Sequence, residues 1–301
     1  MDKELGQINL RMHQVRALRE LRLPSGIMNT EALMLILNKK YKTSDGRRML
    51  FKYLDEQEDQ EVMNRKTKTL TVLNNSEYME LEELVIPEYS VNVDGSHAGF
   101  AMPLIERHKN LGKILNDERL SFDAKRKLLI KLGDLIDKVR RVKSNNPMYF
   151  GDLNEFNFII DQDGNLRAID LDSVFVSGIE GIQPSRLAYY LLKNNYIAAI
   201  PDKYKTTDEG IIIPSENSDL YCYNMIILDT LANERMFKID IDTYYQYLAY
   251  LKSIGMPSEL LDSFERIYLP KNNINPRRMI DEIPKRLGKK CDFQTFKAKR
   301  K

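Results

Sequence analysis

The stretch GDLNEFNFIIDQDGNLRAIDLD, residues 151–172, places polar side chains at the ends of two short apolar runs. Asp152 and Asn157 lie at the two ends of a tight loop that leads into the first run, and Asp170 ends the second. If the two runs pair as strands, these side chains can converge on one side. Carboxylate and amide oxygens are hard ligands suited to Mg²⁺, and a further carboxylate could accept the proton of an attacking hydroxyl. The pattern therefore predicts phosphoryl transfer, in which positioning and charge neutralisation supply most of the catalysis.

The middle of this stretch has a simpler explanation. Asp161, Asp163 and Gly164 are typical residues of a hairpin turn. A calcium loop is excluded, because its sixth position requires glycine and this chain has Leu166 there. The polar residues at the two ends of the stretch lie outside the turn, so turn chemistry does not account for them.

Two hydrophobic hairpins and a helix are predicted in the N-terminal part of the chain. Each hairpin consists of two apolar runs joined by Asp-Gly, a dipeptide that favours a tight turn. The runs of the first hairpin are 32–42 and 47–54, turning at Asp45-Gly46, and those of the second are 83–93 and 97–106, turning at Asp94-Gly95. A polar-faced helix is predicted between them, over residues 57–73.

The rest of the chain is predicted to be mostly helical. Ser121 is placed to cap a helix with Asp123 in its first turn. Apolar residues at helical spacing form one stripe of this helix, namely Leu129, Leu132, Ile136 and Val139. Later helices are predicted over 186–193, 219–233, 241–253 and 258–267.

This order of elements predicts an α+β protein of two lobes. The N-lobe, residues 1–103, is expected to hold an antiparallel sheet and one main helix. The C-lobe, residues 104–301, is expected to be helical and to contain the loop and short hairpin of residues 150–172.

Composition indicates a globular, cytoplasmic protein. Of the 301 residues, 43% are hydrophobic and 30% charged, and the net charge of +2 favours no polyanionic partner, so nucleic acid is not expected to bind. The basic runs near the C-terminus are interpreted as a solvated face or frayed tail. Cys222 and Cys291 form no disulfide framework. No apolar run approaches the roughly 20 residues that span a bilayer, and no secretory signal is recognisable, so no membrane association is expected.

The spacing of the polar residues resembles the catalytic loop of the protein-kinase superfamily. There an Asp is followed five residues later by Asn, then by a hairpin and the metal-binding Asp. Asp152 and Asn157 keep that spacing, and Asp170 follows thirteen residues later. Phe150-Gly151 replaces His-Arg, and Leu171-Asp172 replaces Phe-Gly, which looks more like the aminoglycoside- and choline-phosphotransferase branch. The chain thus resembles a divergent bacterial or phage-type serine/threonine-kinase-like protein.

The resemblance implies a bilobal kinase-like fold and a role for each residue of the loop. Asp152 would orient and deprotonate the acceptor hydroxyl, and Asn157 and Asp170 would hold Mg²⁺. Asp172 would be a second metal ligand or an orienting carboxylate. Lys52, within RRMLFKYL, resembles the lysine that grips the α- and β-phosphates of ATP.

Further motifs fall in the expected order. Met102 would be the gatekeeper beside adenine, with backbone groups of Pro103 and Ile105 contacting the base. Asp219, at the start of SDLYCYNMIILDTL, is either a brace of the catalytic loop or an ordinary helix N-cap. Glu216 in PSEN would pair with Arg277 or Arg278 in NPRRMIDEI.

Three features depart from the family pattern. The phosphate-covering glycine-rich loop is missing, since PSGIMNTE holds only Gly26. No glutamate is spaced as the usual partner of Lys52; Glu61 is the nearest candidate and Glu58 the next. Asn154 stands where protein kinases have Lys and small-molecule phosphotransferases usually have His, which implies weaker stabilisation of the transferring phosphoryl group.

The expected function is therefore ATP- and Mg²⁺-dependent phosphoryl transfer to a hydroxyl, with serine or threonine of a protein as the leading acceptor. The first alternative is a nucleotide-binding pseudokinase acting as a regulatory or scaffold module. The second is a small-molecule kinase of the aminoglycoside or choline type, to whose acceptor pocket Asp229, Glu234 and Asp240 could contribute. The oligomeric state is left open.

Overall fold

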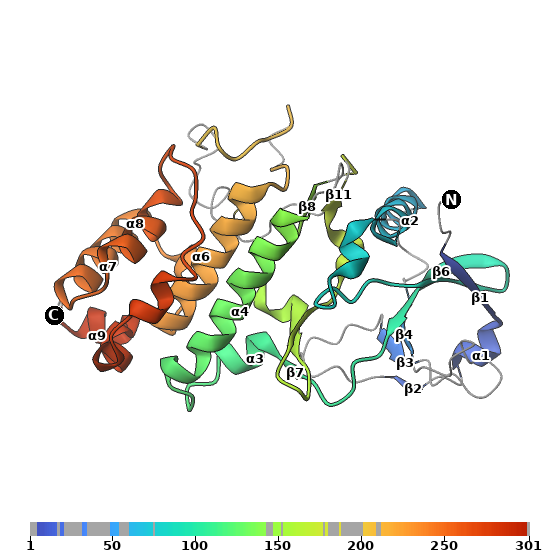
Figure 1. The fold of residues 1–301 in the computed structure, drawn as a ribbon, viewed down its shortest axis with the longest axis horizontal. Helices are drawn as coiled ribbons and strands as arrows, with labels where there is room; N and C mark the ends of the chain where they lie inside the picture. The colour runs from blue at the N-terminus through green and yellow to red at the C-terminus, as the bar shows by residue number, and fades with distance from the viewer. Residues whose placement is uncertain are drawn as a thin grey trace. The chain divides into compact units, whose positions relative to one another are not determined.

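The protein, described by a computed structural model, is an α+β chain that divides into two compact units (Figure 1). The structure describes residues 5–16, 19–20, 32–34, 49–53, 60–74, 76–142, 147–151, 153–176, 178–179, 187, 201–208 and 212–299. Unit 1 comprises Met1–Asn110, Val142–Pro147 and Phe156–Ile179, and unit 2 comprises Leu111–Arg141, Met148–Glu155 and Glu180–Lys301. The predicted division at residue 104 differs, because the central hairpin belongs to unit 1.

Unit 1 is built on a mixed sheet with the strand order β1-β5-β6-β4-β3-β2. Its strands are β1 (Gly6–Leu10), β2 (Arg19–Glu20), β3 (Ala32–Met34), β4 (Met49–Tyr53), β5 (Tyr89–Val93) and β6 (Ser96–Pro103). The pairs β5–β6, β4–β6, β3–β4 and β2–β3 are antiparallel, whereas β1 pairs with β5 in parallel. The expectation of a purely antiparallel sheet is therefore wrong at this edge, because the N-terminal strand β1 was not recognised.

The turn between β5 and β6 has the predicted sequence and geometry. Asp94 and Gly95 both have positive φ, 49° and 88°, and connect the paired residues Val93 and Ser96. Two consecutive positive φ angles define the hairpin turn that Asp-Gly favours. The other predicted turn, at Asp45-Gly46, lies outside the described residues.

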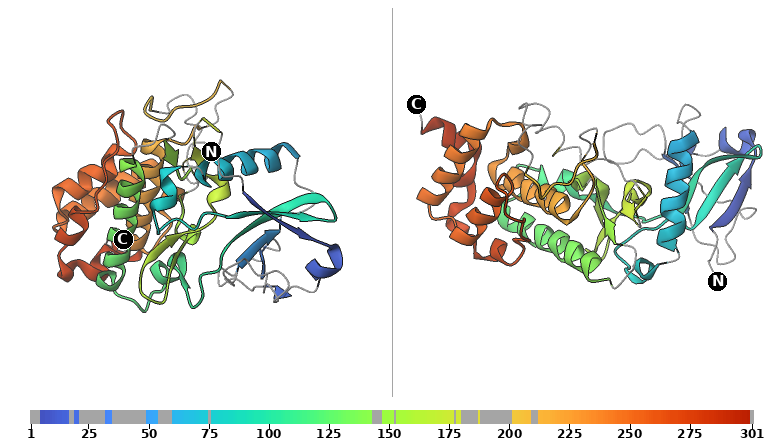
Figure 2. Two further views of the ribbon diagram at one scale, coloured as in Figure 1. Left: turned by 45° about the vertical axis from the view of Figure 1, so that its right-hand side comes forward. Right: turned by 90° about the horizontal axis from the view of Figure 1, so that it is seen from above.

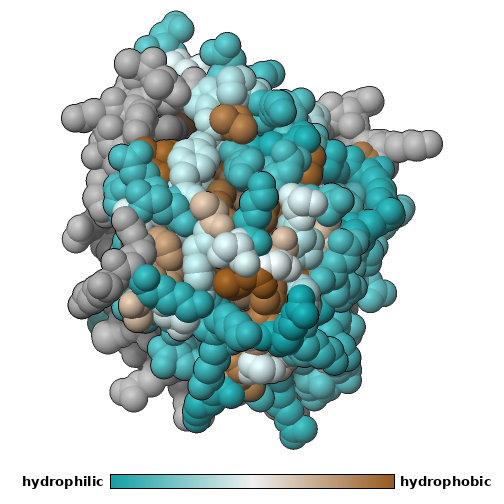
Figure 3. All heavy atoms as spheres, turned by 90° about the vertical axis from the view of Figure 1, so that its left-hand side faces the viewer, coloured by the Kyte–Doolittle hydropathy of each residue, from teal (hydrophilic) through white to brown (hydrophobic). Residues whose placement is uncertain are grey.

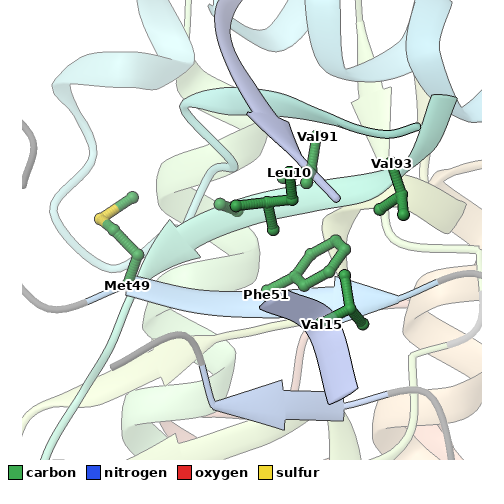
Figure 4. Close-up of a cluster of buried hydrophobic side chains, with 7 residues drawn as sticks. Leu10, Val15, Met49, Phe51, Val91 and Val93 are labelled. Atoms are coloured by element: carbon green, nitrogen blue, oxygen red, sulfur yellow. The ribbon is translucent and has the colours of Figure 1, made fainter. Parts of the chain in front are cut away.

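Strand β4 separates a hydrophobic core from the face that carries Lys52. Met49 and Phe51 are fully buried in a cluster that also contains Leu10, Val15, Val91, Val93 and Ala101 (Figure 4). Successive side chains of a strand point to opposite faces of the sheet. Lys52 therefore projects from the face opposite this cluster.

Helix α2 (Gln60–Asn74) confirms the helix predicted over residues 57–73, of which 57–59 lie outside the described residues. Leu70 and Leu73 are fully buried, and the helix contacts η3 (Leu171–Ser173) and β11 (Phe175–Val176). Other short elements of unit 1 are α1 (Met12–Arg16), η1 (Glu77–Glu80) and η2 (Glu155–Asn157), whose first residue belongs to unit 2.

The central hairpin forms as predicted, from β9 (Phe158–Ile160) and β10 (Leu166–Ala168), with β7 (Lys109–Asn110) on the far side of β9. In its turn, Asp161 Oδ1 accepts hydrogen bonds from the backbone N–H groups of Asp163 and Asn165. Ala168 exchanges backbone hydrogen bonds with Glu83 and Val85, of 2.7 and 2.9 Å. These bonds to the N-terminal part of the chain are one reason why the hairpin belongs to unit 1.

The described residues of unit 2 are mostly helical and include the short strand β8 (Met148–Tyr149). Its longer helices are α4 (Phe122–Arg141), α6 (Glu216–Ala232), α7 (Ile241–Ser253) and α8 (Ser258–Arg266), and its shorter ones are α3 (Leu111–Leu115), η5 (Met236–Lys238), η6 (Met279–Glu282), η7 (Lys285–Cys291) and α9 (Phe293–Ala298). The predicted helices at 219–233, 241–253 and 258–267 are thereby confirmed to within three residues at each end. The one predicted at 186–193 lies outside the described residues except for Leu187.

Helix α6 is the centre of unit 2. It is buried on nearly all sides, and it packs against α4 and α8 (Figure 2). The predicted stripe of α4, Leu129, Leu132, Ile136 and Val139, is buried, and Ser121 Oγ accepts a hydrogen bond from the N–H of Ala124 as a cap. A helix that is buried on nearly every side, as α6 is, needs partners on every side.

The face of unit 2 shown in Figure 3 is mostly hydrophilic, with small separate hydrophobic spots. Within the ranges that the structure describes, no helix is both long enough and apolar enough to cross a membrane.

Gly99 of β6 lies against the backbone of Lys52 in the neighbouring strand β4. Its φ is +145°, and an added Cβ would collide with the carbonyl oxygen of Lys52. Gly95→Ala is the matched control, because Gly95 also has positive φ but its Cβ would meet nothing within 4 Å. We expect the control to lose about 1 kcal/mol of unfolding free energy from backbone strain, and Gly99→Ala to lose about 2–4 kcal/mol, measured by urea unfolding. Equal losses would show that the close approach to Lys52 is unimportant.

Candidate functional site

Lys52 lies between two aspartates of the predicted site. Its Nζ is 2.5 Å from Asp170 Oδ1 and 3.1 Å from each carboxylate oxygen of Asp172. All three residues belong to unit 1, although 118 positions separate Lys52 from Asp170 in the chain. The structure therefore brings together the lysine and the two carboxylates that the sequence assigned to phosphate and metal.

The hairpin β9–β10 positions Asp170 beside Asn157. Phe158 pairs with Ala168, and the N–H of Ile169 donates to the carbonyl of Asn157 at 2.9 Å, so Asn157 lies opposite the residue before Asp170. Asp170 has left-handed backbone angles, φ 66° and ψ 43°, at the point where β10 gives way to η3. Such angles are uncommon outside glycine, and Asp tolerates them better than most residues. The predicted metal ligands Asn157 and Asp170 thus lie at the same end of one strand pair.

Asp172 has a second lysine beside it, Lys66 of α2, with Lys66 Nζ 3.6 Å from Asp172 Oδ2. Both side chains are buried. Sequence reasoning missed Lys66, although a signal was present: residues 66, 70 and 73 share one face of the helix at helical spacing, and Leu70 and Leu73 are core residues. We call Lys52, Lys66, Asp170 and Asp172 the charge cluster.

Glu61 was predicted as the partner of Lys52, but α2 contributes Lys66 to the charge cluster instead. Glu61 is exposed in the first turn of the helix. Five residues separate Glu61 from Lys66, which places their side chains about 140° apart around the helix axis. The ion pairs that the structure gives Lys52 go to Asp170 and Asp172. Glu58, the other candidate, lies outside the described residues.

Electrostatics within the charge cluster distinguish its two carboxylates. Burial lowers the pKa of Lys52, but the two aspartates more than compensate, so the net pKa is raised and Lys52 stays charged. For Asp170, burial and the neighbouring charge of Asp172 raise the pKa above its ordinary value despite Lys52. For Asp172, burial alone would raise the pKa, but the two lysines and a hydrogen bond from Asp170 have the larger effect, so the net pKa is lowered. Asp170 is therefore the less completely compensated carboxylate of the two.

The donor set of the charge cluster fits a hard divalent cation held together with phosphate. Asp170 offers carboxylate oxygens beside Asn157. The ammonium of Lys52 donates hydrogen bonds to Asp170 and Asp172, which shows that these carboxylates accept a positive charge between them. Within the described ranges, no group of three or more His, Cys, Asp or Glu could hold a metal by itself. Mg²⁺ does not require such a group, because it keeps several waters and is commonly held by one or two carboxylates plus substrate phosphates.

Of the predicted adenine-contacting residues, Met102 and Pro103 lie on β6, the strand that pairs with β4, and Ile105 follows that strand. In the β4–β6 register, Lys52 pairs with Phe100 and Leu50 pairs with Met102, so Met102 and Lys52 share one face of the sheet. Met102 is buried, and Pro103 ends β6. The carbonyl of Ile105 accepts a hydrogen bond from His108 Nδ1 at 2.6 Å, so this carbonyl is already engaged.

In unit 2, Asp219 braces the backbone just before the predicted base. Its carboxylate accepts hydrogen bonds from the N–H groups of Phe150 and Gly151, at 2.9 and 3.1 Å. Ser215 caps α6 in a reciprocal pair with Ser218, so Asp219 is a brace and not the N-cap. Burial raises the pKa of Asp219 to about 7, although the two N–H donors lower it.

The predicted base, Asp152, lies outside the described residues. Asn154 lies in unit 2 and is half-buried. The structure therefore describes the backbone that leads to Asp152 and the residue two positions after it.

The predicted pairing of Glu216 with Arg277 or Arg278 is wrong. Glu216 Oε1 is 2.6 Å from Arg140 Nη2, and Arg277 pairs with Asp134 and, at 2.7 Å, with Asp137. Helix α4 carries all three of these partners, so Glu216 and Arg277 each form an ion pair with α4 and not with each other. Arg278 is exposed.

The three acidic residues proposed for a small-molecule pocket have structural contacts. Asp229 accepts from the N–H of Met236 at 2.8 Å and pairs with Arg235, which also pairs with Glu155. Asp240 caps α7 through the N–H of Thr243 at 2.8 Å, and Glu234 Oε1 accepts from the N–H of Arg235. These contacts account for the presence of the three carboxylates without a small-molecule substrate.

The Asp219 brace gives the second prediction. Asp219→Ala removes the acceptor of two buried N–H groups, and we expect a loss of about 2–4 kcal/mol of unfolding free energy. Asp202→Ala, at an exposed aspartate of unit 2, should change it by less than about 0.5 kcal/mol. Chemical denaturation of both variants checks the comparison. A loss at Asp219 no larger than that of the control would contradict the brace.

Comparison with known proteins adds no family assignment. No protein-family model matches the chain, and no curated protein matches it significantly. The resemblance to protein kinases therefore remains a prediction from the residues of the chain itself.

Proposed function

We propose that the chain is an ATP- and Mg²⁺-dependent phosphotransferase, acting on serine or threonine hydroxyls of a protein. The observation that carries this proposal is the position of Lys52 against Asp170, at 2.5 Å, beside Asn157 and on the sheet face that also carries Met102. A lysine and a metal-binding carboxylate from distant parts of the chain are the shared equipment of ATP-dependent phosphoryl transfer.

Each residue has a role in this proposal. Lys52 fixes the α- and β-phosphates, and Asn157 and Asp170 hold the metal, with Asp172 beside them. Mg²⁺, when bound with the nucleotide, neutralises charge on the transferring phosphoryl group. By the resemblance to the kinase catalytic loop, Asp152 would accept the proton of the acceptor hydroxyl, and Asn154 stands two positions after it in the chain.

The proposed fold is a bilobal kinase-like fold. Its support is the sheet of unit 1 with one main helix, the helical unit 2, and the brace from Asp219 to the loop before Asp152. The alternative acceptor class, a small molecule, has less support, because Asp229 and Asp240 already serve structural contacts.

Asp170→Asn tests the catalytic assignment. The change keeps a residue that tolerates the left-handed backbone but removes the charge that holds the metal. We expect it to abolish γ-phosphate transfer from labelled ATP to substrate or to the protein itself, while circular dichroism remains unchanged. Asp163→Asn, at an exposed turn position of the same hairpin, should retain full transfer. Undiminished labelling by Asp170→Asn would refute the assignment.

The competing assignment, a nucleotide-binding pseudokinase, is favoured by the engagement of Lys52 with both aspartates and by Asn154 at a usually basic or histidine position. Calorimetry with ATP, followed by an assay for transfer of labelled phosphate, separates the two functions. We expect ATP to bind more tightly with Mg²⁺ than without it, and labelled phosphate to appear on an acceptor protein. Binding without transfer to any acceptor would favour the pseudokinase, and no binding at all would reject both.

A further inference from the structure

The four side chains of the charge cluster form two pairs that differ in depth. The side chains of Lys66 and Asp172 are 8% and 3% exposed, whereas those of Lys52 and Asp170 are 13% and 35% exposed. Asp172 thus forms the buried end of the cluster, and the Nζ atoms of both lysines lie close to its Oδ2, at 3.1 and 3.6 Å. Asp170 forms the accessible end, where an incoming cation or phosphate would arrive.

This gradient separates the roles of the two aspartates. A cation that binds Asp170 Oδ1 would displace Lys52 from that oxygen, because Lys52 Nζ lies 2.5 Å from it. Asp172 would still hold Lys52 through both of its oxygens, at 3.1 Å each. An ammonium has three donors, so Lys52 can keep Asp172 and also donate to phosphate.

We infer that Asp172, held in place by Lys66, is the positioning carboxylate of Lys52 and replaces the missing glutamate of α2. The helix then contributes a cation that fixes the carboxylate, where the sequence suggested that it contributes an anion. Lys66 serves this role because its positive charge, 3.6 Å from Asp172 Oδ2, adds a second attraction to the carboxylate that Lys52 also contacts. Asp172 is accordingly not a metal ligand.

The inference rests on the proposed function only in its nucleotide experiment. In the full-length protein, Asp172→Asn should raise the Kd of ATP at saturating Mg²⁺ about tenfold, as expected for the loss of one charge-assisted contact. The half-saturating Mg²⁺ concentration should stay within about twofold of wild type. A metal ligand would give the reverse: a large rise in the Mg²⁺ requirement and a normal Kd at saturating Mg²⁺. That reverse result would overturn the inference.

Lys66 is tested by loss and conservative rescue. Lys66→Met should raise the Kd of ATP about threefold or more, because Asp172 loses one of the charges that fix it, and Lys66→Arg should restore binding. The matched control is Lys68→Met, at an exposed position of the same helix. A merely structural role would lower the melting temperature without this pattern of rescue in binding.

A measurement without nucleotide keeps the inference independent of the proposed function. The ¹⁵N NMR signal of the Lys52 ammonium should be visible in the wild type, since buried hydrogen bonds slow its exchange with water. It should be lost in Asp172→Asn and retained in Glu61→Gln. If Asp172→Asn does not fold, the double variant Lys66→Met/Asp172→Asn replaces it, because removing both buried charges together is less destabilising.

The two experiments distinguish the possible failures. If wild-type protein binds no nucleotide while the ammonium signal follows the expected pattern, the proposed function fails and the Lys52–Asp172 pairing stands. If the signal survives in the Asp172 variants, or is lost in Glu61→Gln, the inference is overturned whatever the nucleotide does.

Discussion

The ion pairs between Lys52 and the two aspartates are the interaction on which the account of unit 1 depends. They join strand β4 to the segment after β10 across 118 positions of the chain. A buried charge is costly unless it is paired, so this arrangement requires each element to hold its side chain in place. Gly99 lets β6 approach β4 at Lys52, the hairpin delivers Asp170, and α2 adds Lys66 against Asp172.

Unit 2 follows a different constraint, the burial of nearly the whole of helix α6. Helix α6 is covered by its neighbours, and several of its buried polar groups have specific partners. The hydroxyl of Tyr223 donates a hydrogen bond to the carbonyl of Leu129 at 2.8 Å, and the carboxylate of Asp219 accepts hydrogen bonds from two backbone N–H groups. The same helix therefore forms the core of the unit and fixes the backbone that precedes Asp152.

Local patterns in the sequence predicted the elements well, and the ion pairs poorly. Helical periodicity located α4, and Asp94-Gly95 located the β5–β6 turn, because both features are set by neighbouring residues. The Glu216 pairing failed because α4 supplies competing charges that only the packed helices reveal. Lys66 was missed because a lysine on an apolar helix face is ordinarily a solvated side chain, and its partner Asp172 lies far away in the chain.

We propose that Lys52 and Asp170 together form a nucleotide and metal site. A crystal structure with Mg²⁺ and a non-hydrolysable ATP analogue tests it most directly. We expect Lys52 Nζ to lie within hydrogen-bonding distance of the α- or β-phosphate while still in contact with Asp172, and an Asp170 oxygen to lie about 2.1 Å from Mg²⁺. Nucleotide bound elsewhere, with Lys52 still bridging both aspartates, would contradict it.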